Sequence, residues 1–392
     1  MSEISEPICS PVRAAYIHVP FCQRKCAYCD FASCAGKLEL LPAYVEALLR
    51  EISLTTLFSE AGDHQPLDSV FFGGGTPSLM LPADLNKILA ALADSFGLSP
   101  QAEITFEANP GTLNGARMRE FRQAGCNRIS LGVQTLNPGL LAVLGRLHDA
   151  ETAVDSLRQA EAAGFARISA DLMFGLPGQT TADVESTVKQ ILDLPVNHLS
   201  YYSLSLEPGT VFYAKYQERP ELLPDEETER AQYDSLIAAS SAAGMEHYEI
   251  SNSACPGERC RHNTVYWRAE PYYGFGAAAH SYVKAVRRGN ESNLDSYLKS
   301  IAAAEGPFAA AVSVEEISRP EQEQEFMLLG LRLLEGVSAC DYRARFGSDM
   351  WQRFAPEIER LTRRGLVEKY DNSLRLTKTG LDLANQVFIE FV

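Results

Sequence analysis

The chain has 392 residues, of which 46% are hydrophobic and 22% charged, and its formal net charge is −16 at pH 7. This length and apolar content suffice for two domains with a sizeable core. The acidic excess argues against a broad phosphate-binding surface, so nucleic acid is not expected as the main partner.

The sequence also bears on where the protein works. The first thirteen residues contain no apolar run of the kind found in secretory signals, and no stretch of about 18 apolar residues occurs in the chain. Nine cysteines is an odd count, which does not favour a secreted disulfide framework. We therefore expect no transmembrane segment and a cytoplasmic, reducing location.

Short strands alternate with helices through the first half of the chain. Strands are predicted at 14–19, 69–72, 103–107, 128–132, 166–172 and 198–204, and helices at 43–57, 82–96, 114–124, 150–163 and 182–192. Strand-then-helix units in succession call for a parallel sheet with helices outside. The predicted fold class is α/β, a partial (β/α)6 TIM-like barrel open on one side.

Notable residues fall where these strands end. Cysteines follow the first strand, glycines 73–75 follow the second, and Glu107, Gln134 and Asp171 lie at or near the ends of the next three. Barrel enzymes build their sites at the carboxyl ends of the strands. We therefore expect one site at this end of the barrel.

The cysteines Cys22, Cys26 and Cys29 have the spacing C-x3-C-x2-C. A [4Fe–4S] cluster normally takes four thiolates, so three ligands leave one iron open to a small molecule. Structural zinc sites usually combine two separated Cys or His pairs, and no second pair follows here at zinc-ribbon distance. The pattern predicts an iron–sulfur metal site with these three ligands.

The strand–helix alternation breaks near residue 206. The C-terminal region predicts three helices followed by two short strands, an order that resembles a winged helix. Residues 321–392 hold ten Lys and Arg against twelve Asp and Glu, a net charge of −2 without a basic stripe, so we expect a packing or partner-docking domain rather than a DNA-binding one. The expected divisions are a tail at 1–13, the barrel at 14–206, an extension at 207–305, a linker at 306–324 and a C-terminal α+β domain at 325–392.

Five motifs occur in order on the expected strand ends: YIHVPFC from residue 16, the three cysteines, GGGTP from 73, EANP from 107 and DLMFGLP from 171. Together they resemble the radical S-adenosylmethionine (SAM) superfamily. More narrowly, they resemble the group shared by oxygen-independent coproporphyrinogen III oxidases and the HemW heme chaperones. The resemblance covers nearly the whole chain.

The resemblance implies that SAM chelates the open iron. It implies SAM contacts at Tyr16, Tyr28, Gly74, Gly75, Thr76, Glu107, Gln134, Arg146 and Asp171. Tyr28 matches an aromatic residue that packs on adenine, Glu107 a ribose ligand, and the last three residues positions that hold a second SAM in the oxidases. Each of these roles has an alternative that stays open. The glycines could form only a tight turn, Glu107 could join a structural ion pair, and Arg146 could pair with Asp171 instead of binding a ligand.

Two departures separate this chain from the oxidases. They carry a fourth cysteine two residues after the last cluster ligand, where this chain has Phe31, and they have a longer segment before the cluster than the 21 residues here. The motif H-N-x-x-Y-W at 262–267 matches HemW-type proteins instead. It makes His262 a candidate heme ligand, with a packed core histidine as the alternative.

The resemblance therefore implies a cluster-bearing heme chaperone that binds heme and passes it to an acceptor protein of unknown identity. The alternative is an oxygen-independent coproporphyrinogen III oxidase, which converts propionates to vinyl groups with SAM. A third possibility is that the fold and cluster serve only as structure. Whether SAM is cleaved does not follow from the residues.

Overall fold

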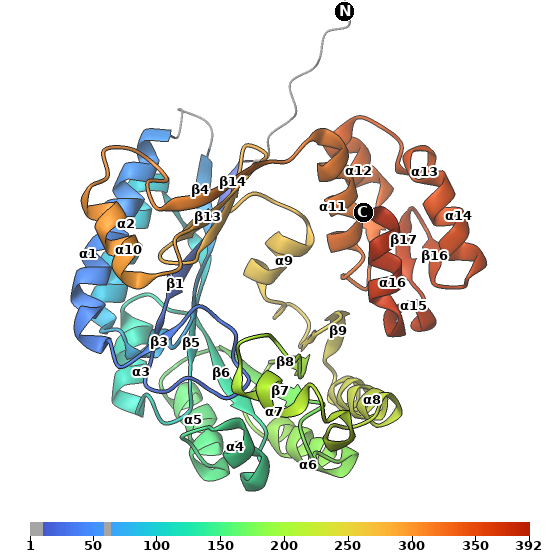
Figure 1. Ribbon diagram of the computed structural model, residues 1–392, viewed down its shortest axis with the longest axis horizontal. Helices are drawn as coiled ribbons and strands as arrows, with labels where there is room; N and C mark the ends of the chain where they lie inside the picture. Colours follow the sequence, from blue (N-terminus) through green and yellow to red (C-terminus); the bar gives the residue numbers. More distant parts are fainter. Residues whose placement is uncertain (1–10, 59–63) are drawn as a thin grey trace, which may run out of the picture.

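The computed structural model describes residues 11–58 and 64–392, so the expected tail at 1–13 lies mostly outside the described residues. Within them, a nine-stranded sheet has the order β11-β1-β4-β5-β6-β7-β8-β10-β9 (Figure 1). Six strands in its centre are parallel: β1 (Val12–Val19), β4 (His64–Gly74), β5 (Leu98–Ala108), β6 (Arg128–Gln134), β7 (Arg167–Phe174) and β8 (His198–Ser203).

Helices connect these strands and cover the outside of the sheet (Figure 1). They are α1 (Leu41–Thr55), α2 (Pro82–Phe96), α3 (Gly115–Gln123), α4 (Pro138–Leu144), α5 (Ala150–Ala162) and α6 (Thr181–Leu192). Asn114, Asp149 and Thr180 each precede a helix and accept a hydrogen bond from a backbone N–H of its first turn, which fixes where those helices begin. The predicted alternation of strand and helix is confirmed.

The sheet curves but does not close, because β11 and β9 lie at opposite edges of the strand order. The predicted partial barrel is therefore confirmed. The sequence did not predict the edge strands: β11 (Tyr273–Phe275) pairs parallel to β1, and β10 (Asn252–Ala254) and β9 (Glu246–Glu249) extend the β8 side antiparallel. Each is only three or four residues long, too short for a periodic signal.

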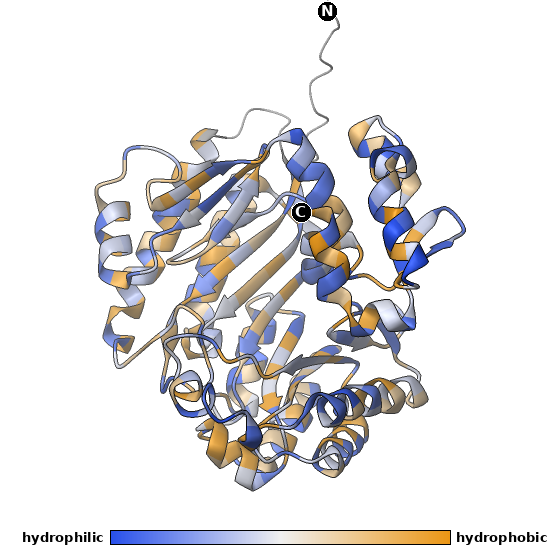
Figure 2. Ribbon diagram, turned by 45° about the vertical axis from the view of Figure 1, so that its right-hand side comes forward, coloured by the Kyte–Doolittle hydropathy of each residue, from blue (hydrophilic) through white to orange (hydrophobic). Residues whose placement is uncertain are grey.

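The inner face of the barrel is partly polar. In Figure 2 the strands carry both hydrophilic and hydrophobic residues. Five small polar side chains on the central strands are buried: Ser69, Thr105, Ser130, Ser169 and Ser200. The apolar core instead lies mainly between the strands and the outer helices. This arrangement leaves a polar interior below the strand ends where the site is expected.

The segment after β8 adds helices and a small sheet. Helices α7 (Val211–Tyr216) and α8 (Glu226–Ala242) follow the barrel, and α9 (Arg261–Trp267) lies between its open side and the C-terminal helices (Figure 1). Next come β12 (His280–Val283), β13 (Val286–Asn290), α10 (Leu294–Ala302) and β14 (Ala311–Glu316), whose strands form an antiparallel sheet. The expected linker, 306–324, thus contains a strand, whose exposed polar residues resembled a loop in the sequence.

The C-terminal region has its own apolar core. Its helices are α11 (Arg319–Gly330), α12 (Ala339–Phe346), α13 (Met350–Arg353), α14 (Ala355–Arg363), α15 (Lys378–Asp382) and α16 (Ala384–Phe388). Strands β15 (Val337–Ser338), β16 (Val367–Tyr370) and β17 (Ser373–Leu376) pair in the order β15-β17-β16, as in a winged helix. No helix in the described ranges has the length and apolar character to cross a membrane.

Candidate functional site

The three cysteines lie on one closed loop at the carboxyl end of β1. Short strands β2 (Phe21–Cys22) and β3 (Cys34–Ala35) pair in parallel and bring the ends of the loop together. Within it, the Cys29 N–H donates to the Cys26 carbonyl at 3.3 Å. Cys22 is buried, whereas Cys26 and Cys29 are half-buried. The loop therefore presents three thiols where the strands end.

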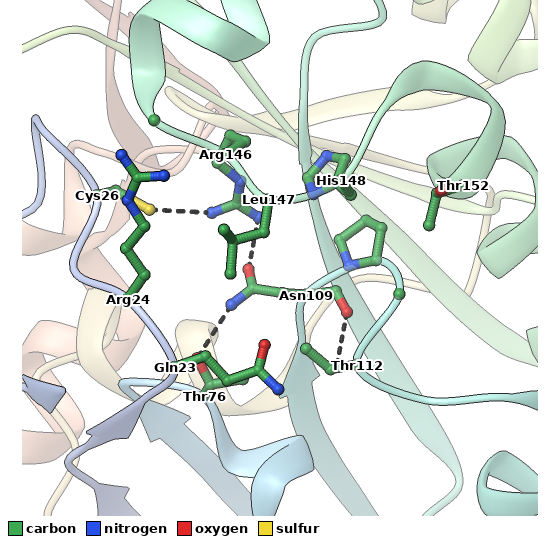
Figure 3. Close-up of a pocket in the computed structure, with 13 residues that line it drawn as sticks. Gln23, Arg24, Cys26, Thr76, Asn109, Thr112, Arg146, Leu147, His148 and Thr152 are labelled. Carbon is green, nitrogen blue, oxygen red and sulfur yellow. Dashed lines mark hydrogen bonds between the residues drawn. The ribbon is translucent and has the colours of Figure 1, made fainter. Parts of the chain in front are cut away.

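A hydrogen-bond network joins two of these thiols through Thr76, Asn109 and Arg146, and Figure 3 shows the part of it that runs from Thr76 to Cys26. The Thr76 hydroxyl donates to Cys22 Sγ at 3.5 Å and accepts from Asn109 Nδ2 at 3.0 Å. Arg146 donates to Asn109 Oδ1 at 2.5 Å through Nη2 and to Cys26 Sγ at 3.5 Å through Nη1. Hydrogen bonds to ligand sulfurs tune the potentials of iron–sulfur clusters, so this network would act on any cluster that these thiols bind.

Asn109 is the member of the network that the sequence analysis missed. It belongs to the EANP motif, two residues after Glu107, but it received no role there. Its position just after β5 was the available signal, since the other site residues follow strands in the same way. The structure makes it the link between Thr76 and Arg146.

A pocket of about 430 Å³ opens beside this network (Figure 3). Its wall includes Arg24, Cys26, Thr76, Asn109, Arg146 and His148. Burial, and then the charge of Arg146, lower the pKa of His148 to about 4, so this imidazole is neutral near pH 7. The pocket gives Cys26 and Arg146 a route to solvent.

The glycine run permits close approach of the cysteine loop. Gly74 has φ +108°, and a Cβ there would stand 2.5 Å from the His18 ring. A Cβ on Gly75 would stand 2.7 Å from the Phe21 carbonyl oxygen. Both positions thus require glycine to accommodate the protein's own chain. SAM contact by Gly74 and Gly75 stays a prediction.

His18 ties the barrel to the cysteine loop. Its Nε2–H donates to the Ala32 carbonyl at 2.8 Å, and its Nδ1 accepts from the Tyr16 hydroxyl at 3.0 Å. Burial lowers the pKa of His18, which favours the neutral ring that this pairing needs. The sequence analysis assigned His18 no role, although it lies in the motif that contains Tyr16.

Two carboxyl groups face the barrel interior close together. Glu107 accepts from the Gly74 N–H at 3.2 Å, and Asp171 accepts from Ser130 Oγ at 2.9 Å. Burial, and then repulsion from Asp171, raise the pKa of Glu107 to about 8; burial also raises the pKa of Asp171. Neither carboxyl forms an ion pair within the described ranges, so the alternative of a structural ion pair at Glu107 is not seen there.

Arg146 does not pair with Asp171. Besides Asn109 and Cys26, it donates to the Gly132 carbonyl at 2.6 Å. A Cβ on Gly132 would meet Gln134 Nε2 at 3.1 Å and Arg146 Nη2 at 3.2 Å, so this glycine makes room for both side chains. Gln134 has φ +67°, and such strain concentrates at ligand sites.

Tyr28 lies on the α7 side of the cysteine loop. Its ring centroid is 6.3 Å from that of Phe212, and burial raises the pKa of its hydroxyl, which Arg146 partly offsets. The Phe212 N–H donates to the Ala27 carbonyl at 2.9 Å, so α7 holds this part of the loop. Adenine packing by Tyr28 stays a prediction.

His262 lies in the barrel interior on α9. It is 1% exposed, and its ring shares hydrogen bonds with Ser69 Oγ at 3.1 Å and the Tyr266 hydroxyl at 2.9 Å. The ring also stacks on Phe71, with centroids 5.3 Å apart. Burial lowers its pKa to about 3. Heme ligation by His262 stays a prediction, and it requires one of these hydrogen bonds to break.

The donor set of the cysteine loop fits an iron–sulfur cluster. Among residues 11–58 and 64–392, no three Cys, His, Asp or Glu side chains converge on a position for one metal ion. A cluster of four irons binds its cysteines at different irons, so it suits thiols that are held apart. Hydrogen-bond donors at Cys22 and Cys26 suit the same group.

Comparisons with known proteins agree with the motifs. Residues 16–191 match the Radical SAM superfamily, and residues 317–383 match the HemN C-terminal domain. The heme chaperone HemW of Bacillus subtilis is 36% identical over 97% of this chain and 99% of its own, and that of Lactococcus lactis is 35% identical over 97% of both. The structure of coproporphyrinogen III oxidase (HemN) from Escherichia coli superposes with a TM-score of 0.84 at 22% identity, covering 99% of this chain and 91% of that one.

Proposed function

The chain belongs to the HemW family of the radical SAM superfamily, and from that premise we propose that it is a heme chaperone, which binds heme and passes it to an acceptor protein. The proposal rests on the similarity of this chain, over almost its full length, to proteins named heme chaperone HemW. The acceptor is unidentified. We place the protein in the cytoplasm, and we keep the proposed domain divisions at 14–206, 207–305 and 325–392.

The proposal assigns the cluster to Cys22, Cys26 and Cys29. With SAM bound, such a cluster supplies one-electron cleavage of the sulfonium. The chain's own contribution is positional: Thr76 and Arg146 donate hydrogen bonds to two of the sulfurs. Hydrogen bonds of this kind hold the thiolates in place and stabilise their negative charge.

The SAM site is proposed on the same end of the barrel. Glu107 and Asp171 offer two carboxyl groups that form no ion pair in the described residues, although the charge of Arg128 lowers the pKa of both, and such groups suit a ligand with hydroxyl donors. The residues proposed to hold SAM are Tyr16, Tyr28, Gly74, Gly75, Thr76, Glu107, Gln134, Arg146 and Asp171. The strained φ of Gln134 supports a ligand position there.

One paired experiment tests the chaperone role. Anaerobically reconstituted protein is assayed in parallel for heme uptake and for turnover of coproporphyrinogen III with SAM and a reductant. We expect near-stoichiometric heme uptake without turnover. Turnover of coproporphyrinogen III at the rate of a true oxidase, without heme uptake, would reject the chaperone role in favour of the oxidase activity.

Variants of two residues accompany this experiment. Cys26→Ala should abolish the cluster's visible absorbance, because it removes one of three ligands. His262→Ala should weaken heme uptake if that residue is the ligand. Unchanged uptake would remove His262 from the heme site and leave the chaperone role intact.

A further inference from the structure

A small cavity of about 200 Å³ opens at the end of the barrel away from the cysteine loop, where β6 and β7 begin. The residues of its wall include Gln101, Glu103, Arg122, Asn127, Arg167 and Arg261. Pockets for drug-sized ligands usually measure roughly 300–1,000 Å³, so this cavity suits a single small group. The charges of its wall indicate which group that is.

The cavity has one acidic side chain, Glu103, against three arginines. Glu103 is buried and already accepts four hydrogen bonds, from Arg167 Nη1, Cys260 Sγ and the backbone N–H groups of Arg261 and His262. Arg167 also pairs with Glu258 at 2.9 Å. Both carboxylates are therefore committed to Arg167 and to the start of α9 rather than to the side chains of the other two arginines.

These two arginines, Arg122 and Arg261, have no carboxylate partner in the part of the chain that the structure describes. Arg122 donates to the carbonyl groups of Gly164 and Cys126, and Arg261 donates to that of Gln101 at 2.9 Å. Neutral carbonyl groups satisfy some of the N–H donors but leave both charges unbalanced. Two like charges at the wall of one small cavity repel each other unless an anion lies between them.

Neighbouring arginines at this end of the barrel are paired. Arg261 also lines an adjoining cavity of about 470 Å³. The other arginines of that cavity each pair with a carboxylate: Arg13 with Asp68, and both Arg259 and Arg268 with Glu335. In a chain with a net charge of −16, the unpaired state of Arg122 and Arg261 is thus a property of the smaller cavity and not of the surrounding surface.

We propose that the smaller cavity is a phosphate site, in which Arg122 and Arg261 together bind one doubly charged phosphate group. Such a group carries a charge of about −1.5 to −2 at pH 7, which matches the two unpaired guanidinium groups. The planar fork of N–H donors on each guanidinium also fits the oxygens of a phosphate. This site is independent of the chaperone function, because it lies at the other end of the barrel from the cluster loop.

The bound phosphate joins two elements that are far apart in the sequence. Arg122 lies in the last turn of α3, and Arg261 is the first residue of α9. A ligand that binds only the folded protein stabilises it, and the amino-terminal face of a barrel contributes to stability more than to chemistry. Phosphate therefore holds the start of α9, the helix that carries His262, against the barrel.

The first test measures the binding of inorganic phosphate to the full chain by the broadening of its ³¹P NMR signal, with chloride keeping the ionic strength constant. Arg122→Gln and Arg261→Gln should each weaken binding at least about tenfold, the usual worth of a charge-assisted hydrogen bond. Arg158→Gln is the matched control, because Arg158 is exposed on α5 and does not line the cavity. No binding by the unaltered chain, or an equal loss in all three variants, would overturn the proposal.

Competition identifies the source of the phosphate group. Glycerol phosphate that displaces inorganic phosphate at a similar concentration would assign the site to a phosphate ester, and failure to displace it would assign the site to the free ion. Displacement by the same concentration of chloride would show an adventitious ion only and would overturn the proposal.

The second test asks whether phosphate holds α9 in place. Phosphate should slow the amide hydrogen exchange of residues 261–267 in the unaltered chain and in Arg158→Gln, but not in Arg261→Gln. Because phosphate also stabilises proteins in general, equal slowing in all three proteins would overturn the link between α3 and α9. The free energy of unfolding without phosphate identifies a variant that misfolds, and the other arginine variant then carries the test.

Discussion

Replacing Gly74 with alanine tests whether His18 fixes the cysteine loop to the barrel. The new Cβ would lie 2.5–2.9 Å from three atoms of the His18 ring, so the ring has to move. It would then lose its hydrogen bonds to Ala32 and Tyr16. At about 0.5–1.5 kcal/mol each, these bonds add about 1–3 kcal/mol to the backbone strain that alanine meets at positive φ.

Gly178→Ala separates these two costs. Gly178 also has positive φ, +74°, but no atom lies within 4 Å of a Cβ built there. Urea unfolding should give Gly74→Ala a free energy of unfolding lower than that of Gly178→Ala by about 1–3 kcal/mol. Gly74→Ala should also lose its cluster faster in air. Equal unfolding free energies and equal cluster lifetimes for the two variants would refute the role of His18.

Three further predictions concern other polar residues of the barrel. Asn109→Leu should shorten the lifetime of the cluster's absorbance in air, because Thr76 and Arg146 lose their common partner; a lifetime equal to that of the unaltered chain would exclude this role. The raised pKa of Glu107, about 8, means that its contribution to stability is lost as pH rises from about 4.5 through 8. Measured without SAM, the free energy of unfolding of Glu107→Gln should therefore rise relative to that of the unaltered chain by on the order of a few kcal/mol between pH 5 and pH 8.5. A difference between the two proteins that does not change with pH would contradict the raised pKa of Glu107. The pH dependence that His262 contributes has the opposite sign. Its pKa of about 3 in the folded protein lies below the unfolded value, so its contribution to stability is lost as pH falls from about 6.5. The free energy of unfolding of the unaltered chain should exceed that of His262→Gln by less at pH 4.5 than at pH 7. An equal difference at both pH values would place His262 outside the buried interior.

The strand-end pattern predicted which candidate residues the structure brings to one end of the barrel, because that pattern reflects topology. In a parallel sheet every strand ends at the same edge, so Cys22, Glu107 and Asp171 had to come near one another whatever their partners. The helix at 82–96 was predicted with the observed bounds, because Pro82 and Gly97 mark its ends. Local sequence signals of this kind therefore predict the ends of a helix correctly.

The partners of each side chain did not follow from the sequence. Nothing in the spacing of Arg146 shows that it donates to Asn109 and Cys26 rather than to Asp171. The H-N-x-x-Y-W motif made His262 a candidate ligand, but the hydrogen bonds of His262 to Ser69 and Tyr266 depend on how α9 packs against the barrel. Contacts between segments far apart in the chain are set by tertiary packing, which one sequence does not reveal.

The state of the iron tests the central claim most directly. Mössbauer spectra of protein reconstituted without oxygen should show a [4Fe–4S] cluster in which one iron changes its spectrum when SAM is added, because Cys22, Cys26 and Cys29 bind only three of the four. The account would be contradicted by a preparation without such a cluster, or by one in which the spectra of all four irons stay unchanged when SAM is added.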